Sequence, residues 1–134
     1  MIRSAFAELL AKHRIPNFTN FYSIGTTYFN RELSSFASIA LSSRNVPDDL
    51  IKSFISTHMS NFDQGGDPED CFLVMSEDHY DTIHREYPNS NIFYISELLG
   101  EKIEIKDPYF FGGYPDVFEY ISECVDVMSR LLSE

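Results

Sequence analysis

The sequence predicts an α/β fold, a three-layer sandwich in which helices flank a parallel sheet. Two short apolar runs, residues 71–75 and 91–95, have the composition of strands, and a helical pattern separates them. A strand, a helix and a second strand in this order favour parallel pairing through a crossover. With 134 residues, 43% of them apolar and 15% aromatic, the chain can build the core of one domain over residues 1–134.

The first half of the chain is predicted to contain helices around one strand. Residues 2–14 fit an amphipathic helix whose basic residues lie near its end, where they suit the helix dipole. Residues 20–25 fit a short strand that ends in a turn, and residues 32–43 fit a second helix. A further helix over residues 50–55 is expected to begin at one of the two aspartates that precede it.

The second half supplies the clearest strand and the longest helix. Residues 71–75 are continuously apolar, which is typical of a strand buried on both faces. Ser76 is expected to cap a helix that Pro88 ends, and residues 91–95 form the next strand candidate. Pro115 suits the first position of a terminal helix. The apolar residues of that helix, at helical spacing, are Val117, Phe118, Ile121, Val125, Met128 and Leu132.

The overall charge limits the partners of the protein. The formal net charge is −11 and the isoelectric point is near 4.6, so the surface as a whole repels nucleic acid and anionic membranes. No signal peptide, membrane span or lipidation motif is visible, and a cytoplasmic location is expected. Cys71 and Cys124 lie far apart in apolar surroundings, and the histidines have no metal-ligand spacing with them. We therefore expect neither a metal nor another cofactor.

An arginine–serine pair, Arg3 and Ser4, stands at the start of the first predicted helix. Helix N-termini favour anions, because free N–H groups and the positive end of the helix dipole lie there. Far downstream, Asp107 is placed on a stiff loop before Pro108 and flanking aromatic residues. A carboxylic acid opposite a phosphate site can donate a proton to the leaving group of an ester. The two features together suggest a phosphate-ester site.

The order of these signals resembles the low-molecular-weight protein tyrosine phosphatase family along almost the whole chain. Arg3 and Ser4, running into residues 5–8, resemble the end of that family's phosphate loop and the start of its first helix. The other matching segments, in chain order, are Ser23-Ile24-Gly25-Thr26 with Phe29-Asn30, Leu73-Val74-Met75 with His79, Glu97-Leu98-Leu99-Gly100, and Asp107-Pro108-Tyr109-Phe110. Each segment is short, and their shared order carries the resemblance.

The resemblance implies hydrolysis of phosphotyrosine through a cysteinyl-phosphate intermediate. In the family, a cysteine thiolate six positions before the loop arginine attacks phosphorus, and the arginine binds the phosphate oxygens with the loop N–H groups. On this chain, Arg3 is the matching arginine, Ser4 would hold the thiolate by a hydrogen bond, and Asp107 is the matching general acid. The residues implied to line the cleft for a phosphotyrosine-containing protein or a small aryl phosphate are Phe29, Asn30, Tyr109 and Phe110.

The nucleophile itself is missing from the sequence. The position six residues before Arg3 falls before residue 1, together with the family's first strand and most of its phosphate loop. By analogy the missing strand is a central one, between residues 20–25 and 71–75, so unpaired strand edges and self-association are expected. As written, the chain should lack turnover. A start site assigned too late or a shortened chain is favoured over a naturally degenerate domain.

Two other functions are considered. One is a catalytically dead module that binds a phosphopeptide or a protein partner through the residual cleft. The other is an arsenate-reductase relative, which requires closely placed resolving cysteines that Cys71 and Cys124 do not provide. His79 beside Asp78 does not indicate a catalytic dyad, since adjacent residues on a helix do not face each other. We assign His79 to packing at the helix start and Cys124 to the core.

Overall fold

A computed structural model of the chain describes residues 2–17, 21–24, 33–57, 59 and 71–132, with the backbone alone at positions 109 and 110. The elements in these residues are α1 (Arg3–Arg14), α2 (Ser35–Ser43), α3 (Asp48–Lys52), β1 (Cys71–Val74), α4 (Glu77–Glu86), β2 (Asn91–Tyr94), the 3₁₀ helix η2 (Ile95–Leu99), α5 (Pro108–Phe111) and α6 (Tyr114–Leu132).

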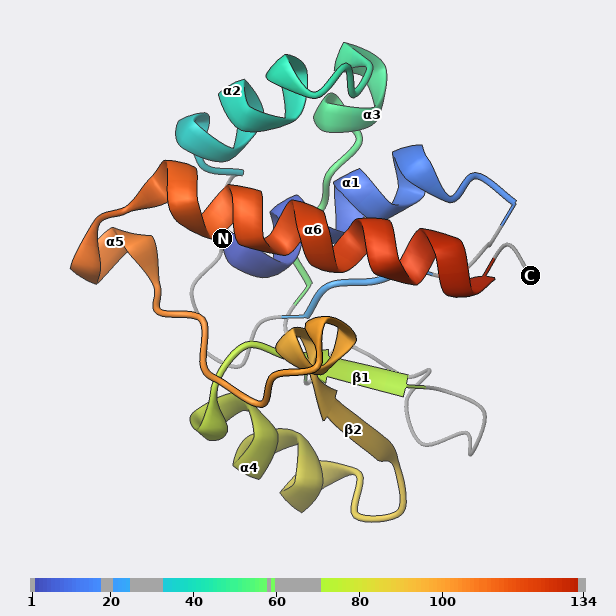
Figure 1. Cartoon of the computed structure of the whole chain (residues 1–134), viewed down its shortest axis with the longest axis vertical. Helices are drawn as coiled ribbons and strands as arrows, with labels where there is room; N and C mark the ends of the chain where they lie inside the picture. The colour runs from blue at the N-terminus through green and yellow to red at the C-terminus, as the bar shows by residue number, and fades with distance from the viewer. Residues whose placement is uncertain (1, 18–20, 25–32, 58, 60–70, 133–134) are drawn as a thin grey trace.

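The elements form layers around a parallel sheet (Figure 1). β1 and β2 pair in parallel, with Cys71 opposite Asn91 and Val74 opposite Tyr94. The connecting helix α4 packs against both strands on one side, and α1 and α6 lie on the other side of the sheet. α2 packs against α1 and α6 on the side away from the sheet. The predicted α/β sandwich with a parallel sheet is confirmed.

The β1–α4–β2 unit follows from local signals in the sequence. The hydroxyl oxygen of Ser76 accepts a hydrogen bond from the N–H of His79 at 3.4 Å, which is the predicted helix cap. Glu77 and Asp78 occupy the first turn of α4, where acidic side chains complement the helix dipole. The cap therefore fixes the start of α4 directly after the end of β1.

The core lies where α1 crosses α6. The rings of Phe6 and Phe118 lie 4.6 Å apart between their centroids, and Phe6 is fully buried. At the far end of α1, Arg14 donates to the carboxylate of Asp126 at 2.6 Å and to the hydroxyl of Ser122 at 2.9 Å. Cys124 is fully buried in α6, as predicted. The two helices thus contact each other near both ends of α1, which positions its first turn.

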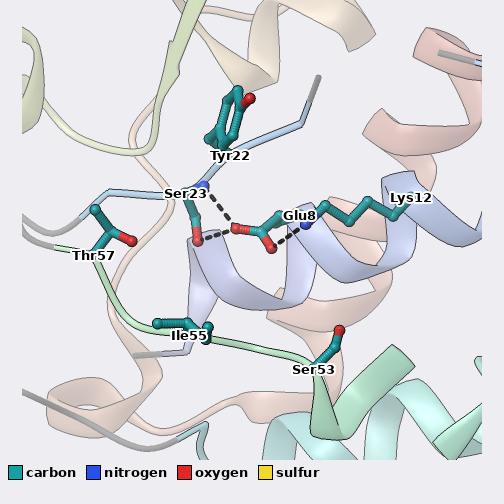
Figure 2. Close-up of a pocket in the computed structure, with 7 residues that line it drawn as sticks. All are labelled: Glu8, Lys12, Tyr22, Ser23, Ser53, Ile55 and Thr57. Carbon is teal, nitrogen blue, oxygen red and sulfur yellow. Dashed lines mark hydrogen bonds and ion pairs between the residues drawn. The ribbon is translucent and has the colours of Figure 1, made fainter. Parts of the chain in front are cut away.

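The prediction of a strand over residues 20–25 is wrong for its described part, since residues 21–24 are in no strand. The backbone N–H and the hydroxyl of Ser23 both donate to the same carboxylate oxygen of Glu8, each at 2.7 Å (Figure 2). The Glu8 carboxylate therefore accepts from the backbone N–H of Ser23, which in a β-sheet would donate to a neighbouring strand.

Other boundaries also differ from the predictions. The strand expected to be buried on both faces ends at Val74, and its first residue, Cys71, is exposed. The helix predicted over residues 50–55 is α3, which ends at Lys52, and the hydroxyl of the next residue donates to a carbonyl of that helix. α6 begins one residue before Pro115. The short helices η2 and α5 were not expected.

None of the helices in the described part of the chain is both long enough and apolar enough to cross a membrane.

Candidate active site

The first side chain of α1 reaches across to a segment a hundred residues later in the sequence. Arg3 begins α1, and one guanidinium nitrogen, Nη1, donates a hydrogen bond to the carbonyl oxygen of Ile105. The other nitrogen, Nη2, lies 3.9 Å from Oδ2 of Asp107. The Arg3 side chain is only 13% exposed. The N-terminus of α1 therefore carries a cation that is held in a fixed place and is mostly shielded from water.

Asp107 is presented by the start of α5. The carbonyl of Asp107 accepts from the N–H of Phe111, and that of Pro108 accepts from Gly112, so the chain turns into a helix directly after the aspartate. Pro108 is buried and stands at the first helical position, where proline is favoured. The Asp107 side chain keeps 31% exposure. Its carboxylate thus lies within ion-pair distance of Arg3 and is partly exposed.

The segment before Asp107 is attached to the carboxyl end of β1. The N–H of Ile105 donates to the carbonyl of Met75 at 2.8 Å. A carboxylate oxygen of Glu104 accepts from the N–H of Glu77 at 2.7 Å, at the start of α4. Three elements, α1, the end of β1 with α4, and the 103–107 segment, therefore meet at one edge of the sheet. Ligands of open α/β sheets bind at this edge, beyond the carboxyl ends of the strands.

The charges at this edge act on one another. Burial lowers the pKa of the Arg3 guanidinium, while the carboxylates of Asp107 and Glu104 raise it. An arginine keeps its positive charge in proteins despite such a shift. The residue is therefore a permanent, mostly buried cation with the carboxylate of Asp107 beside it.

His79 belongs to the same edge, which the sequence did not indicate. It is half-buried in the first turn of α4, in agreement with packing at the helix start. Burial lowers the pKa of its imidazole most, followed by the charge of Arg3, while Asp78, Asp107 and Glu104 raise it. The place of His79 shortly after the carboxyl end of β1 is the signal that sequence reasoning could have used.

The remaining predicted site residues are only partly described. Ser4 lies half-buried in the first turn of α1, and Ile2 occupies the N-cap position. Phe29 and Asn30 lie outside the described residues. Tyr109 and Phe110 contribute the backbone of α5, next to Asp107, and their side chains lie outside the described part.

Neither cysteine of the sequence lies at this edge. Cys71 is at the start of β1, the end of the strand opposite to Met75 and Ile105, and burial raises the pKa of its thiol. Cys124 is fully buried in α6, and burial raises the pKa of its thiol to about 11. Both thiols are therefore mostly protonated at neutral pH, which makes them weak nucleophiles. The described residues also contain no cluster of side chains that could hold a metal ion.

A separate cavity of about 210 Å³ lies beside the middle of α1 (Figure 2). Its charged groups are Glu8 and Lys12, whose side chains form an ion pair with each other at 2.9 Å. The Glu8 carboxylate also holds Ser23, so its hydrogen-bonding capacity is used within the protein. Because the cation that lines this cavity, Lys12, is paired with Glu8, we do not assign a phosphate site to it.

The fold is similar to that of solved bacterial tyrosine phosphatases. The tyrosine phosphatase AmsI from Erwinia amylovora is 20% identical, with a TM-score of 0.81 over 100% of this chain and 87% of its own. The tyrosine phosphatase Wzb from Escherichia coli K30, solved with sulphate, is 20% identical, with a TM-score of 0.77 over 98% of this chain and 90% of its own. Wzb from Vibrio vulnificus, solved with benzylphosphonate, is 17% identical, with a TM-score of 0.76 over 97% of this chain and 90% of its own.

At the level of sequence, no family model and no curated protein matches the chain. The motifs in their order and the structural likeness over nearly the whole chain nevertheless agree with each other. The chain has the fold of the low-molecular-weight protein tyrosine phosphatases.

Proposed function

We propose that the chain binds the phosphate group of a phosphotyrosyl ligand between the first turn of α1 and Asp107. The observation that carries the proposal is the position of Arg3, a shielded cation at a helix N-terminus, 3.9 Å from the carboxylate of Asp107. A guanidinium next to free helix N–H groups is suited to bind the oxygens of a phosphate. Two proteins of similar structure were solved with sulphate and with benzylphosphonate, which are a phosphate-like anion and an aryl-type phosphonate.

Asp107 has the role of general acid in this proposal. As a carboxylate it competes with the bound phosphate for Arg3, because both are anions. With a proton, it becomes a hydrogen-bond donor to the ester oxygen that leaves as phenolate. Its exposure of 31% leaves room for that oxygen to approach. The aryl ring would then lie against the start of α5, where Tyr109 and Phe110 follow the acid.

Turnover requires a nucleophile that the 134 residues do not provide. Both cysteines are placed away from Arg3, and both thiols are mostly protonated at neutral pH. We therefore propose that the 134-residue chain binds the phosphotyrosyl group without hydrolysing it. The family reaction would need a thiolate beside Arg3, supplied by residues upstream of Met1. If none is encoded there, the protein is a binding module with the same site.

The test separates binding from turnover. Calorimetry with a phosphotyrosine peptide and its unphosphorylated form should show binding of the phosphorylated peptide alone. Arg3→Ala should weaken it by at least about tenfold, because a charge-assisted hydrogen bond contributes about 1.5–3 kcal/mol. Arg85→Ala, an exposed arginine in the last turn of α4, is the matched control and should bind normally. Equal binding by the Arg3→Ala and Arg85→Ala variants would exclude the site.

An assay of p-nitrophenyl phosphate hydrolysis completes the test. The 134-residue chain should show no turnover, and a chain extended upstream along the genomic reading frame should hydrolyse the ester if that extension carries the thiol. Turnover by the 134-residue chain itself would contradict the proposed need for an upstream nucleophile. A stop codon directly before Met1 would support the binding module.

A further inference from the structure

We propose that His79 is a proton-coupled member of the anion site: its imidazole takes up a proton when a phosphate-type dianion binds at Arg3, so that the site binds dianions more tightly as the pH falls. This inference rests on the proposed function, because it assumes that the anion is bound beside Arg3. It adds a role for His79 in the anion site and a pH dependence, neither of which the motif resemblance provides.

The position of His79 is fixed by backbone contacts. It is the third residue of α4, and its N–H donates to the Ser76 hydroxyl at 3.4 Å, directly after the end of β1. Glu77, two residues earlier, donates its N–H to Glu104 at 2.7 Å. The same segment reaches Arg3 through the carbonyl of Ile105. The first turn of α4 therefore lies against the segment that holds Arg3 and Asp107.

The charged groups whose electrostatic effect reaches His79 come from three elements. Arg3 belongs to α1, Asp78 to α4 itself, and Glu104 and Asp107 to the segment before α5. Burial and the positive charge of Arg3 lower the pKa of the imidazole, and the three carboxylates oppose them with a smaller effect. With a pKa below its ordinary value of 6.5, His79 is neutral at neutral pH.

A bound dianion changes this balance. It lies on the guanidinium of Arg3 and offsets the positive charge that disfavours protonation of His79. Its own negative charge also attracts the imidazolium. The protonated ring can then donate a hydrogen bond, so that two cations, Arg3 and His79, face the anion across from Asp107 and Glu104. By linkage, an anion that promotes proton uptake must bind more tightly when protons are abundant.

The probe for this coupling is inorganic sulphate, which remains a dianion between about pH 5.5 and about pH 8. Any pH dependence of its affinity in this range therefore comes from the protein. For one coupled proton, the affinity of the unchanged chain should rise as the pH falls, by at most about tenfold per pH unit. His79→Gln should remove most of the rise. His84→Gln, an exposed histidine on the same helix, is the matched control and should keep it.

A second measurement does not depend on any variant. The ring-proton NMR shift of His79, followed against pH, should give a higher pKa in saturating sulphate than without it, while His84 should not change. Sulphate binding that depends on Arg3 but not on pH, or an unchanged His79 pKa, would overturn the coupling and leave the proposed function standing. Absence of Arg3-dependent sulphate binding would overturn both.

Discussion

The guanidinium of Arg3 donates a hydrogen bond to the carbonyl of Ile105, 102 residues later in the sequence. The N–H of Ile105 in turn donates to Met75 at the end of β1. One residue of an irregular segment thus joins the start of α1 to the edge of the sheet. This connection holds the cation of the site at a fixed distance from Asp107, and a preformed site loses less entropy when it binds a ligand.

Replacing Asp107 by asparagine should strengthen the binding of a dianion. The variant keeps the shape of the side chain but removes a negative charge 3.9 Å from Arg3, which competes with the ligand. We expect the sulphate affinity to rise by at least about fivefold at neutral pH, since a unit charge about 4 Å away contributes about 1 kcal/mol even at the dielectric constant of water. Asp116→Asn, at an exposed position in the first turn of α6, should have no effect. Weaker binding by Asp107→Asn would contradict the competition, and calorimetry measures both.

Truncation of Phe6 should destabilise the fold strongly. Its ring is fully buried between α1 and α6, 4.6 Å from the ring of Phe118. Phe6→Ala should lower the free energy of unfolding by about 3–5 kcal/mol, since it removes apolar burial and leaves a cavity. Phe36→Ala, on a ring that is 54% exposed, should cost much less. Urea denaturation measures both; similar losses for the two variants would show that the core lies elsewhere.

The two cysteines should differ sharply in the rate at which an alkylating reagent labels them. Cys71 is exposed, whereas Cys124 is fully buried and has a thiol pKa of about 11. At neutral pH in the native state, iodoacetamide should label Cys71 slowly and Cys124 only after unfolding, because the thiolate is the reactive form. Intact-mass spectrometry before and after denaturation counts the labels. Rapid native labelling of Cys124 would contradict its place in α6.

His79 should make stability depend on pH. Its pKa in the folded chain lies below the value of 6.5 that it has when exposed in the unfolded chain. Below that value the unfolded state binds more protons than the folded state, so stability should fall as the pH falls from about 7 towards about 5.5. Without a ligand, His79→Gln should flatten this slope and His84→Gln should not. Chemical denaturation at several pH values measures this. The same slope of unfolding free energy against pH for the unchanged chain and both variants would contradict the lowered pKa of His79.

The edge of β1 that has no strand partner among the described residues should promote self-association. In the described part of the chain, β1 is hydrogen-bonded to β2 along one of its two edges. An unpaired strand edge is a template for another chain, and a lysine on it discourages pairing. We expect the sedimentation coefficient to rise with protein concentration, and Cys71→Lys to reduce the rise. Ser35→Lys, at an exposed position in α2, is the control; a monomer at all concentrations would contradict the expectation.

The elements with strong local signals were predictable from the sequence. The helical spacing of apolar residues over 117–132 predicted α6. The serine before an acidic first turn predicted α4 with its cap at Ser76. The run at residues 71–74 gave β1 and the stretch after Asn91 gave β2. In each case residues close in the sequence determine the structure.

The early end of α3 has a local cause, the Ser53 hydroxyl that donates to Leu50, whereas the failed strand prediction has a cause farther away in the sequence. Residues 21–24 have the composition of a strand, but Glu8 takes the N–H of Ser23. The sequence suggested Arg3 and Asp107 from motif order, and the structure places them together. The sequence analysis assigned His79 to packing at the helix start and not to the site, because the contact between the 104–107 segment and the start of α4 joins residues 27 positions apart.

The measurement that tests the central claim most directly is a crystal structure of the chain soaked in tungstate, a heavy phosphate analogue. The anomalous signal should lie within hydrogen-bond distance of the Arg3 guanidinium and the first N–H groups of α1, on the side that Asp107 faces. Tungstate bound elsewhere, with the Arg3 and Asp107 side chains still paired to each other, would contradict the account.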